Sequence, residues 1–208
     1  MILAVDGPAA SGKGTIAKAL AEHYGLPHLD TGMLYRATAL NLLLMGGDPE
    51  SEFAAARATD LSQIDFADPE LKSETVGGIA SRISTYQMVR DALLERQRRF
   101  AAQPGGAVLD GRDIGTVIAP EADVKLFVTA SPEVRAQRRY AELKQIGMDV
   151  HYADVLADIR ARDARDTGRE AAPLLAADGA IILDTSSMSA DEAVAAAIAA
   201  VGERAPVD

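Results

Sequence analysis

The feature that most constrains the fold is a glycine-rich segment placed between two regular elements near the N-terminus. The apolar run Ile2–Asp6 predicts a buried strand, and apolar residues at helical spacing predict a helix from Lys13 to Tyr24. Strand, glycine-rich loop and helix in this order form the context that a P-loop requires. The segment that joins the two elements reads Gly7, Pro8, Ala9, Ala10, Ser11, Gly12, Lys13, Gly14 and Thr15.

This segment predicts an ATP site. Glycines let backbone amides turn toward an anion, the start of the helix adds positive potential, and Lys13 can reach the β and γ oxygens. Gly14 stands where Ser or Thr usually follows the lysine, and Thr15 comes one residue later. G-K-G-T of this kind resembles nucleoside monophosphate kinases, in which the threonine contacts the phosphates and Mg²⁺. The alternative is a glycine-rich turn without a ligand.

Strands and helices alternate along the chain, which predicts an α/β fold with a doubly wound, five-stranded parallel sheet and helices on both faces. Residues 48–80 show helical signals only at Glu52–Arg57, and Glu203–Asp208 is expected to form a loose tail. The five predicted strands are Ile2–Asp6, His28–Asp30, Ala107–Asp110, Val124–Thr129 and Ala180–Asp184. The further predicted helices are Met33–Met45, Val89–Phe100, Pro132–Ile146, Tyr152 to about Asp166, and Ala190–Val201.

Length and composition favour one domain. The 208 residues are 48% hydrophobic but only 4% aromatic, which suits small aliphatic side chains packed between helices and a parallel sheet. The chain contains no cysteine, so disulfides and thiolate chemistry are excluded. It has neither a long apolar run nor the basic flank of a signal peptide, so we expect a cytoplasmic protein that binds no membrane.

The charge of the chain is unevenly distributed. A formal net charge of −10 argues against general binding to nucleic acid. Arginine nevertheless greatly outnumbers lysine, and most arginines lie between Arg82 and Arg169. Because the arginine side chain is a planar fork of donors that matches phosphate, we expect a local pocket for a small anion.

Three groups of charged residues are candidates for binding an acceptor. Thr31 is a predicted N-cap one turn before Arg36, and Asp110, Arg112 and Asp113 follow a predicted strand at the sheet edge that binds ligands in α/β proteins. A carboxylate such as Asp110 can hold Mg²⁺ through water, and an arginine can clamp a phosphate. The alternatives are a capped helix with a surface arginine and a salt-bridged turn.

The third group lies on one face of a charged helix and contains Arg162, Arg165, Asp166 and Arg169. A solvated face joined by pairs such as Asp158 with Arg162 is the simpler interpretation. Together with the P-loop, the same helix is interpreted as a lid that surrounds the transferred phosphoryl group with cations and excludes water.

Taken together, these segments resemble bacterial cytidylate kinases over almost the whole chain. The matching segments, in order, are Asp6–Thr15, Leu29–Gly32 with Tyr35 and Arg36, Val89 and Arg90 with Leu93, Leu94 and Arg96–Arg98, Asp110–Thr116, and Arg162–Asp166 with Arg169 and Ala172–Leu174. The resemblance implies one P-loop kinase domain over residues 1–208. Its core would span about 1–47, 85–130 and 170–208, its lid about 131–169, and its monophosphate-binding insert about 48–84. Family members usually carry a longer insert with extended strands, much of which this chain lacks.

The resemblance also implies roles for individual residues. The monophosphate is expected to contact Arg36, Arg112 and Arg169, with Arg162 and Asp166 at the ribose, Ser81, Arg90 and Asp113 at the base, and Thr31 and Asp110 nearby. Lys13, Arg112, Arg162 and Arg169 would be catalytic. Arg135 and Arg139, with Arg138 between them, would lie on the ATP side, and Thr15 and Asp110 would serve Mg²⁺.

The expected reaction is transfer of the ATP γ-phosphate to CMP or dCMP by a monomeric enzyme that requires Mg²⁺. A carboxylate such as Asp113 suits the exocyclic amine of cytosine and disfavours the carbonyl of uracil. One alternative is a kinase for UMP, AMP or a shikimate-like hydroxyl. The other is a nucleotide-binding switch or interaction module that hydrolyses ATP slowly.

Overall fold

The computed structural model describes residues 1–204, which form two compact units. The first unit contains Met1–Leu29 and the chain from Ala101 onward, and the second contains Asp30–Phe100. Part of the predicted tail Glu203–Asp208 cannot be compared with the structure, because residues 205–208 lie outside the described residues. No helix within residues 1–204 has the length and apolar character needed to cross a membrane.

The first unit is built on a five-stranded parallel sheet, as predicted, with the order β2-β3-β1-β4-β5. The central position of β1 places its carboxyl end beside the carboxyl ends of β3 and β4, since Asp6 pairs with Gly111 on one side and with Phe127 on the other. Ligands of open α/β sheets bind at this edge. The strands are β1 (Ile2–Asp6), β2 (His28–Asp30), β3 (Ala107–Gly111), β4 (Val124–Thr129) and β5 (Ile181–Asp184).

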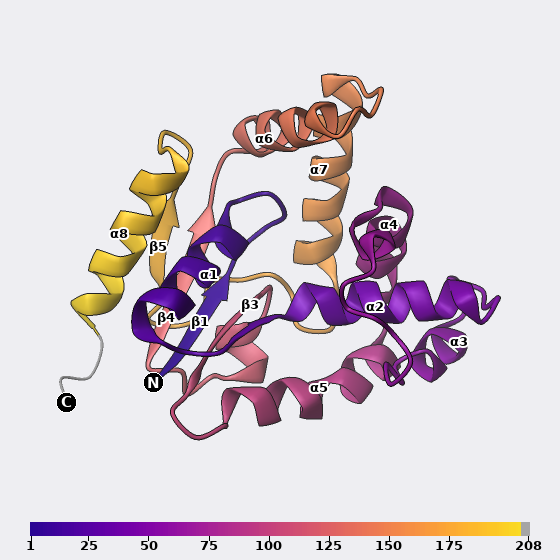
Figure 1. The fold of residues 1–208 in the computed structure, drawn as a ribbon, viewed down its shortest axis with the longest axis horizontal. Helices are drawn as coiled ribbons and strands as arrows, with labels where there is room; N and C mark the ends of the chain where they lie inside the picture. The colour runs from indigo at the N-terminus through magenta and orange to yellow at the C-terminus, as the bar shows by residue number, and fades with distance from the viewer. Residues whose placement is uncertain (205–208) are drawn as a thin grey trace. The chain divides into compact units, whose positions relative to one another are not determined.

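Helices α1 (Lys13–Tyr24) and α8 (Ala190–Gly202) pack against each other and cover one face of the sheet (Figure 1). The core between them is aliphatic, with Leu3, Leu20 and Leu126 almost completely buried. A short π-helix, Ile114–Ile118, packs on β1 and β3. The sequence patterns did not predict this helix. These contacts hold β1, β3 and the loops that follow them in a fixed register.

Helices α6 (Pro132–Gln145) and α7 (Tyr152–Gly168) contact each other at a steep angle at the top of Figure 1 and share a small apolar core. Ala136, Leu143 and Ile159 are buried in this core, and Ala9 of the glycine-rich loop joins them. The predicted lid segment is therefore packed directly onto the predicted phosphate loop.

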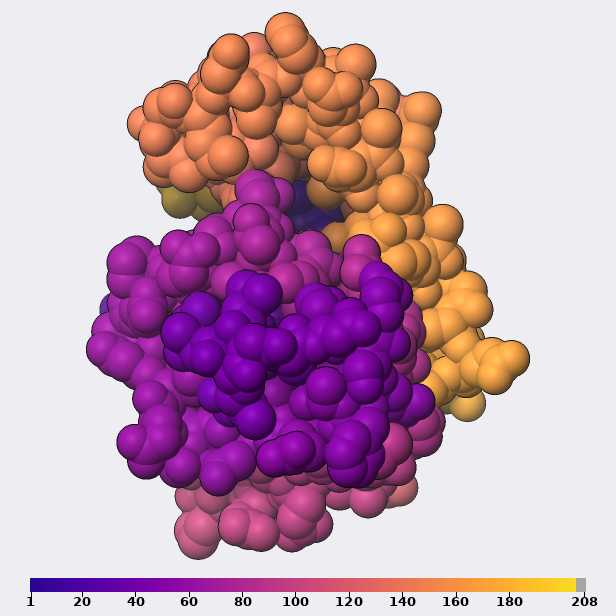
Figure 2. Space-filling model, turned by 90° about the vertical axis from the view of Figure 1, so that its right-hand side faces the viewer, coloured from indigo at the N-terminus to yellow at the C-terminus, as the bar shows by residue number. Residues whose placement is uncertain are grey.

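The regular structure of the second unit after Asp30 is helical, including the segment 48–80 in which the sequence showed little pattern. Figure 2 shows the surface of these helices, coloured from indigo for α2 to magenta for α5. Helix α4 packs extensively on α2. The elements are α2 (Thr31–Leu44), α3 (Glu52–Arg57), the 3₁₀ helix η1 (Pro69–Lys72), α4 (Glu74–Ile83) and α5 (Gln87–Ala101).

The N-cap of α2 differs from the prediction. Asp30, and not Thr31, caps the helix, because its carboxylate accepts a hydrogen bond from the backbone N–H of Met33 at 3.3 Å. Thr31 is the first helical residue and is buried. Asp and Thr are both favourable N-cap residues, so adjacent candidates cannot be separated by residue type alone.

Candidate active site

Two glycines of the loop between β1 and α1 have backbone conformations that residues with a side chain rarely adopt. Gly7 has φ 155°, and a Cβ there would collide with the carbonyl oxygen of Val128. Gly12 has φ 89° and is the N-cap of α1, and because it has no side chain it cannot cap the first N–H groups of this helix. Amides at an uncovered helix N-terminus favour an anionic ligand.

Lys13 and a carboxylate from β3 stand together beside this loop. The Lys13 ammonium lies 3.9 Å from Oδ2 of Asp110, whose side chain is 2% exposed. The other carboxylate oxygen, Oδ1, lies 2.7 Å from Nε2 of His28. His28 was not among the predicted site residues. The sequence offers only an indirect signal for it, because its contact depends on β2 lying beside β3.

The oxygen ligands available here fit a magnesium ion that is shared with a nucleotide. Mg²⁺ in phosphotransferases takes one or two protein oxygens and completes its shell with water and phosphates. Asp110 is buried next to Lys13, and Thr15 is exposed in the first turn of α1. Among residues 1–204 no group of three or more His, Cys, Asp or Glu side chains could hold a metal ion.

Arg112 follows β3 and pairs with Asp166 near the end of α7. Its Nε donates to Oδ2 of Asp166 at 2.7 Å, and both side chains are largely buried. Burial alone would raise the pKa of the Asp166 carboxyl, but Arg112, Arg162 and Arg169 together hold that pKa below its usual value. Asp166 is therefore an anion surrounded by arginines, one of which, Arg112, lies 54 residues away in the chain.

Arg169 forms a second link between the same two regions. One of its terminal nitrogens lies 3.6 Å from Oδ1 of Asp113, and its Nε donates to the carbonyl of Ala172 at 2.6 Å. Arg169 and Asp113 are both buried. The predicted residues Arg112, Asp113, Arg162, Asp166 and Arg169 are thus joined within the first unit by contacts between β3 and the end of α7.

Asp6 connects the phosphate loop to this cluster. Its two carboxylate oxygens accept hydrogen bonds from the backbone N–H groups of Ile114 and Gly115, each at 2.8 Å. Burial raises the pKa of Asp6 to about 6, against the lowering effect of these two N–H groups. Asp6 therefore fixes the turn that follows Asp113 onto the end of β1.

The arginines of α6 contact the phosphate loop through its backbone. Arg135 is buried, donates to the carbonyl of Ala9 at 3.2 Å, and forms a bidentate pair with Asp163 of α7 at 2.9 and 2.6 Å. Arg138 lies 3.4 Å from the carbonyl of Ser11 and donates to the hydroxyl and carbonyl of Thr185. Arg139 pairs on the surface with Glu142. Arg135 and Arg138 thus tie α6 to the loop.

In the second unit, Arg36 is anchored by main-chain carbonyl groups. It donates to the carbonyls of Leu71 and Ser73 at 2.8 and 3.2 Å, on either side of the junction between η1 and α4. Its guanidinium lies against Gly77, where a Cβ would be only 2.8 Å from one terminal nitrogen. The absence of a side chain at Gly77 therefore makes room for Arg36.

Ser81 and Arg90 lie near the turn between α4 and α5. Arg90 is buried and donates to the carbonyl of Ser84 at 3.3 Å and to the hydroxyl of Tyr35 at 3.4 Å. The Ser84 hydroxyl in turn donates to the carbonyl of Ser81 at 2.9 Å. Helices of this one unit therefore position four residues that the sequence analysis singled out, namely Tyr35, Arg36, Ser81 and Arg90.

A parallel α/β sheet, a P-loop with its lysine and an arginine-rich helix pair over that loop define a nucleotide-binding protein of the P-loop class. A solved structure of an uncharacterized protein from Eubacterium ventriosum shares the fold, with a TM-score of 0.56 and 15% identity over 98% of this chain and 99% of that chain. TT1252 from Thermus thermophilus gives a TM-score of 0.51 and 21% identity over 100% and 98% of the two chains.

Sequence similarity identifies the family. The family model for cytidylate kinase matches residues 3–203. A cytidylate kinase from Xanthobacter autotrophicus is 58% identical over 207 residues, which cover 98% of both chains. The chain belongs to the cytidylate kinase family.

Proposed function

We propose that this protein transfers the γ-phosphoryl group of ATP to CMP or dCMP and releases ADP and the corresponding diphosphate. One observation carries the proposal at the level of geometry. The P-loop with Lys13 follows β1, Arg112 and Asp113 follow the adjacent strand β3, and both groups therefore stand at the same edge of the sheet. Membership of the family supports the identity of donor and acceptor.

Residues 7–15 would bind the phosphates of ATP, with the Lys13 ammonium at the β and γ oxygens. Arg135 and Arg139 of α6 would serve the same nucleotide, with Arg135 also holding α6 and α7 together through Asp163. Mg²⁺ would be held by Thr15 and, through water, by Asp110, and it would neutralise charge on the transferred phosphoryl group.

The phosphate of CMP would bind to Arg36, Arg112 and Arg169. Arg112 and Arg169 pair with Asp166 and Asp113 in the structure, so an incoming phosphate would replace a carboxylate as their partner. Arg112, Arg162 and Arg169 would then stabilise charge that develops during transfer, which is the main catalytic requirement of this chemistry.

The ribose would contact Arg162 and Asp166, and Thr31 and Asp110 would complete the acceptor side. Ser81, Arg90 and Asp113 would contact the base. A carboxylate oxygen of Asp113 would accept a hydrogen bond from the exocyclic amine of cytosine, whereas the corresponding carbonyl of uracil has no donor for it. Such a mismatch between buried polar groups discriminates strongly between substrates.

A panel of acceptors tests the proposal. ADP release is followed with ATP and Mg²⁺ in the presence of CMP, dCMP, UMP, AMP or shikimate. CMP and dCMP should give the highest kcat/KM, and UMP should be slower. Faster turnover with AMP or shikimate would identify a kinase for another acceptor, and ADP release at one rate whatever the acceptor would indicate a nucleotide-hydrolysing switch.

A further inference from the structure

His28 contacts a residue of the proposed ATP site, although it lies in no part of the P-loop motif. It is the first residue of β2, its side chain is 17% exposed, and its Nε2 atom lies 2.7 Å from Oδ1 of Asp110. The second oxygen of this carboxylate, Oδ2, lies 3.9 Å from Lys13 Nζ and would be 3.8 Å from a Cβ at Gly14. The two oxygens of Asp110 therefore have separate partners, His28 on one side and the phosphate loop on the other.

This division of partners determines how the carboxylate is oriented. The terminal torsion of an aspartate is broad, so an unbound carboxylate samples many rotations. A short hydrogen bond to one oxygen removes most of that freedom, and burial strengthens the bond because little water competes with it. Since Asp110 is almost fully buried, the bond from His28 keeps Oδ2 directed at Lys13 and Gly14.

From this geometry we infer that His28 is a positioning residue, which orients Asp110 for magnesium-bound ATP without touching the nucleotide. The inference rests on the proposed function, because Asp110 matters in this way only if the loop binds ATP with a metal. Groups that orient a metal-binding residue typically contribute about 10- to 100-fold in metal affinity or activity. A histidine that only satisfied a buried carboxylate would affect folding stability and leave the metal dependence of nucleotide binding unchanged.

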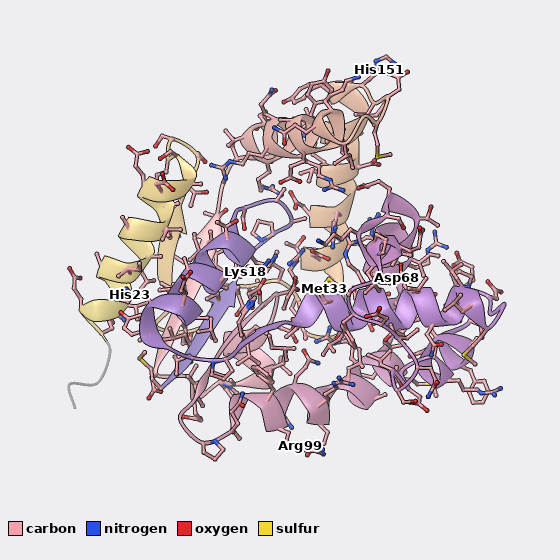
Figure 3. All side chains as sticks on the ribbon, in the orientation of Figure 1. Lys18, His23, Met33, Asp68, Arg99 and His151 are labelled. Carbon is pink, nitrogen blue, oxygen red and sulfur yellow. The ribbon has the colours of Figure 1, made fainter. Side chains whose placement is uncertain are left out.

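The test measures binding of a non-hydrolysable ATP analogue by titration calorimetry, once with Mg²⁺ and once with a chelator. His28→Leu removes the hydrogen-bond donor to Asp110. His28→Asn keeps a polar side chain that is too short to reach Asp110, so it serves as the test variant if the leucine variant does not fold. His28→Gln places an amide N–H near the position of Nε2. His23→Leu is the matched control, since His23 is exposed in the last turn of α1 (Figure 3) and packs against Tyr24.

We expect His28→Leu and His28→Asn to weaken the affinity with Mg²⁺ by about tenfold or more, and the affinity without Mg²⁺ by less than about threefold. His28→Gln should restore most of the loss, and His23→Leu should match the wild type. Equal losses with and without Mg²⁺, no loss in either condition, or a glutamine variant as weak as the leucine variant would each overturn the inference.

The binding measurement needs no acceptor, so it separates this inference from the proposed function. Metal-dependent weakening in the His28 variants together with no CMP-dependent ADP release in the wild type would contradict the proposed reaction and retain the role of His28. CMP phosphorylation by the wild type, together with unchanged metal dependence of ATP binding in the His28 variants, would support the proposed reaction and contradict the role of His28.

Discussion

In the first unit Arg112 and Arg169 are paired with carboxylates, whereas in the second unit Arg36 donates hydrogen bonds to main-chain carbonyls. Arg112 and Arg169 contact Asp166 and Asp113, and each pair joins β3 to the end of α7. Arg36 donates to the carbonyls of Leu71 and Ser73. An incoming phosphate can replace a carboxylate as the partner of Arg112 or Arg169. The main-chain carbonyls that hold Arg36 would stay in place when a phosphate binds.

Because their arginines are held in these different ways, the two units should respond to different kinds of mutation. The charged residues of the first unit depend on each other across many residues of sequence, so changes of charge should have large effects there. The position of Arg36 depends on the local backbone between η1 and α4, so changes of shape should matter more in the second unit. Three substitutions test this contrast.

The largest effect is expected for Lys13→Ala in the first unit. It removes the ammonium that would stabilise the transferred phosphoryl group, and losses of such preorganised groups lower kcat by on the order of a hundred- to a thousandfold. The melting temperature should change little, because Asp110 keeps its bond to His28. Steady-state kinetics and thermal unfolding of the same sample measure both quantities. Turnover by this variant at the wild-type rate would contradict the proposed role of Lys13 and the phosphate loop in phosphoryl transfer.

The second effect concerns the pH dependence of stability through Asp6. Its pKa is raised from 3.8 to about 6 in the folded protein. The folded state therefore binds this proton more tightly than the unfolded state, so the contribution to stability is complete below pH 3.8 and is lost as the pH rises through about 6. A difference of this size corresponds to about 3 kcal/mol.

Asp6→Asn removes this titration. The free energy of unfolding, measured with denaturant at intervals from pH 4 to pH 7, should fall with pH by about 2 kcal/mol more in the wild type than in the variant. Because the asparagine cannot accept both N–H groups of Ile114 and Gly115, the absolute stability of the variant is expected to be lower as well. Parallel pH profiles would show that the carboxyl of Asp6 has the same pKa in both states.

The smallest of the three effects is expected in the second unit for Gly77→Ala. The added methyl group would lie 2.8 Å from a guanidinium nitrogen of Arg36 and would displace it. We expect KM for CMP to rise by about tenfold, equivalent to about 1.4 kcal/mol, with KM for ATP unchanged.

Gly78→Ala is the matched control, since a Cβ at Gly78 meets no atom within 4 Å. Both glycines lie in α4, so both substitutions should stabilise the helix by about 0.5–1 kcal/mol. An equal KM for CMP in the two variants would contradict the assignment of Arg36 to the monophosphate.

Much of the first unit could be predicted from the sequence because its signals are local. Strands β1, β3, β4 and β5 are short, largely apolar runs that end at polar or glycine residues, and the phosphate loop combines glycines with a lysine at a fixed spacing. The predicted five-stranded parallel sheet is confirmed. The contact between His28 and Asp110 could not be predicted in the same way, because it depends on which strands are neighbours in the sheet.

The second unit was harder to predict because its helices carry weaker signals. Helix α4 contains the adjacent residues Gly77 and Gly78, which disfavour helix formation, and its buried Val76, Ala80 and Ile83 mark only one face. Ser73 caps the helix through its hydroxyl, a signal that was present in the sequence and was missed. Packing of α4 on α2 stabilises a helix that local propensity alone does not favour.

Transfer of labelled phosphate from γ-³²P ATP distinguishes phosphorylation of CMP from simple hydrolysis of ATP. With CMP and Mg²⁺ present, we expect the label to appear in CDP at a rate equal to the formation of ADP, and to depend on CMP concentration. Label released only as inorganic phosphate, at a rate that CMP does not change, would contradict the account.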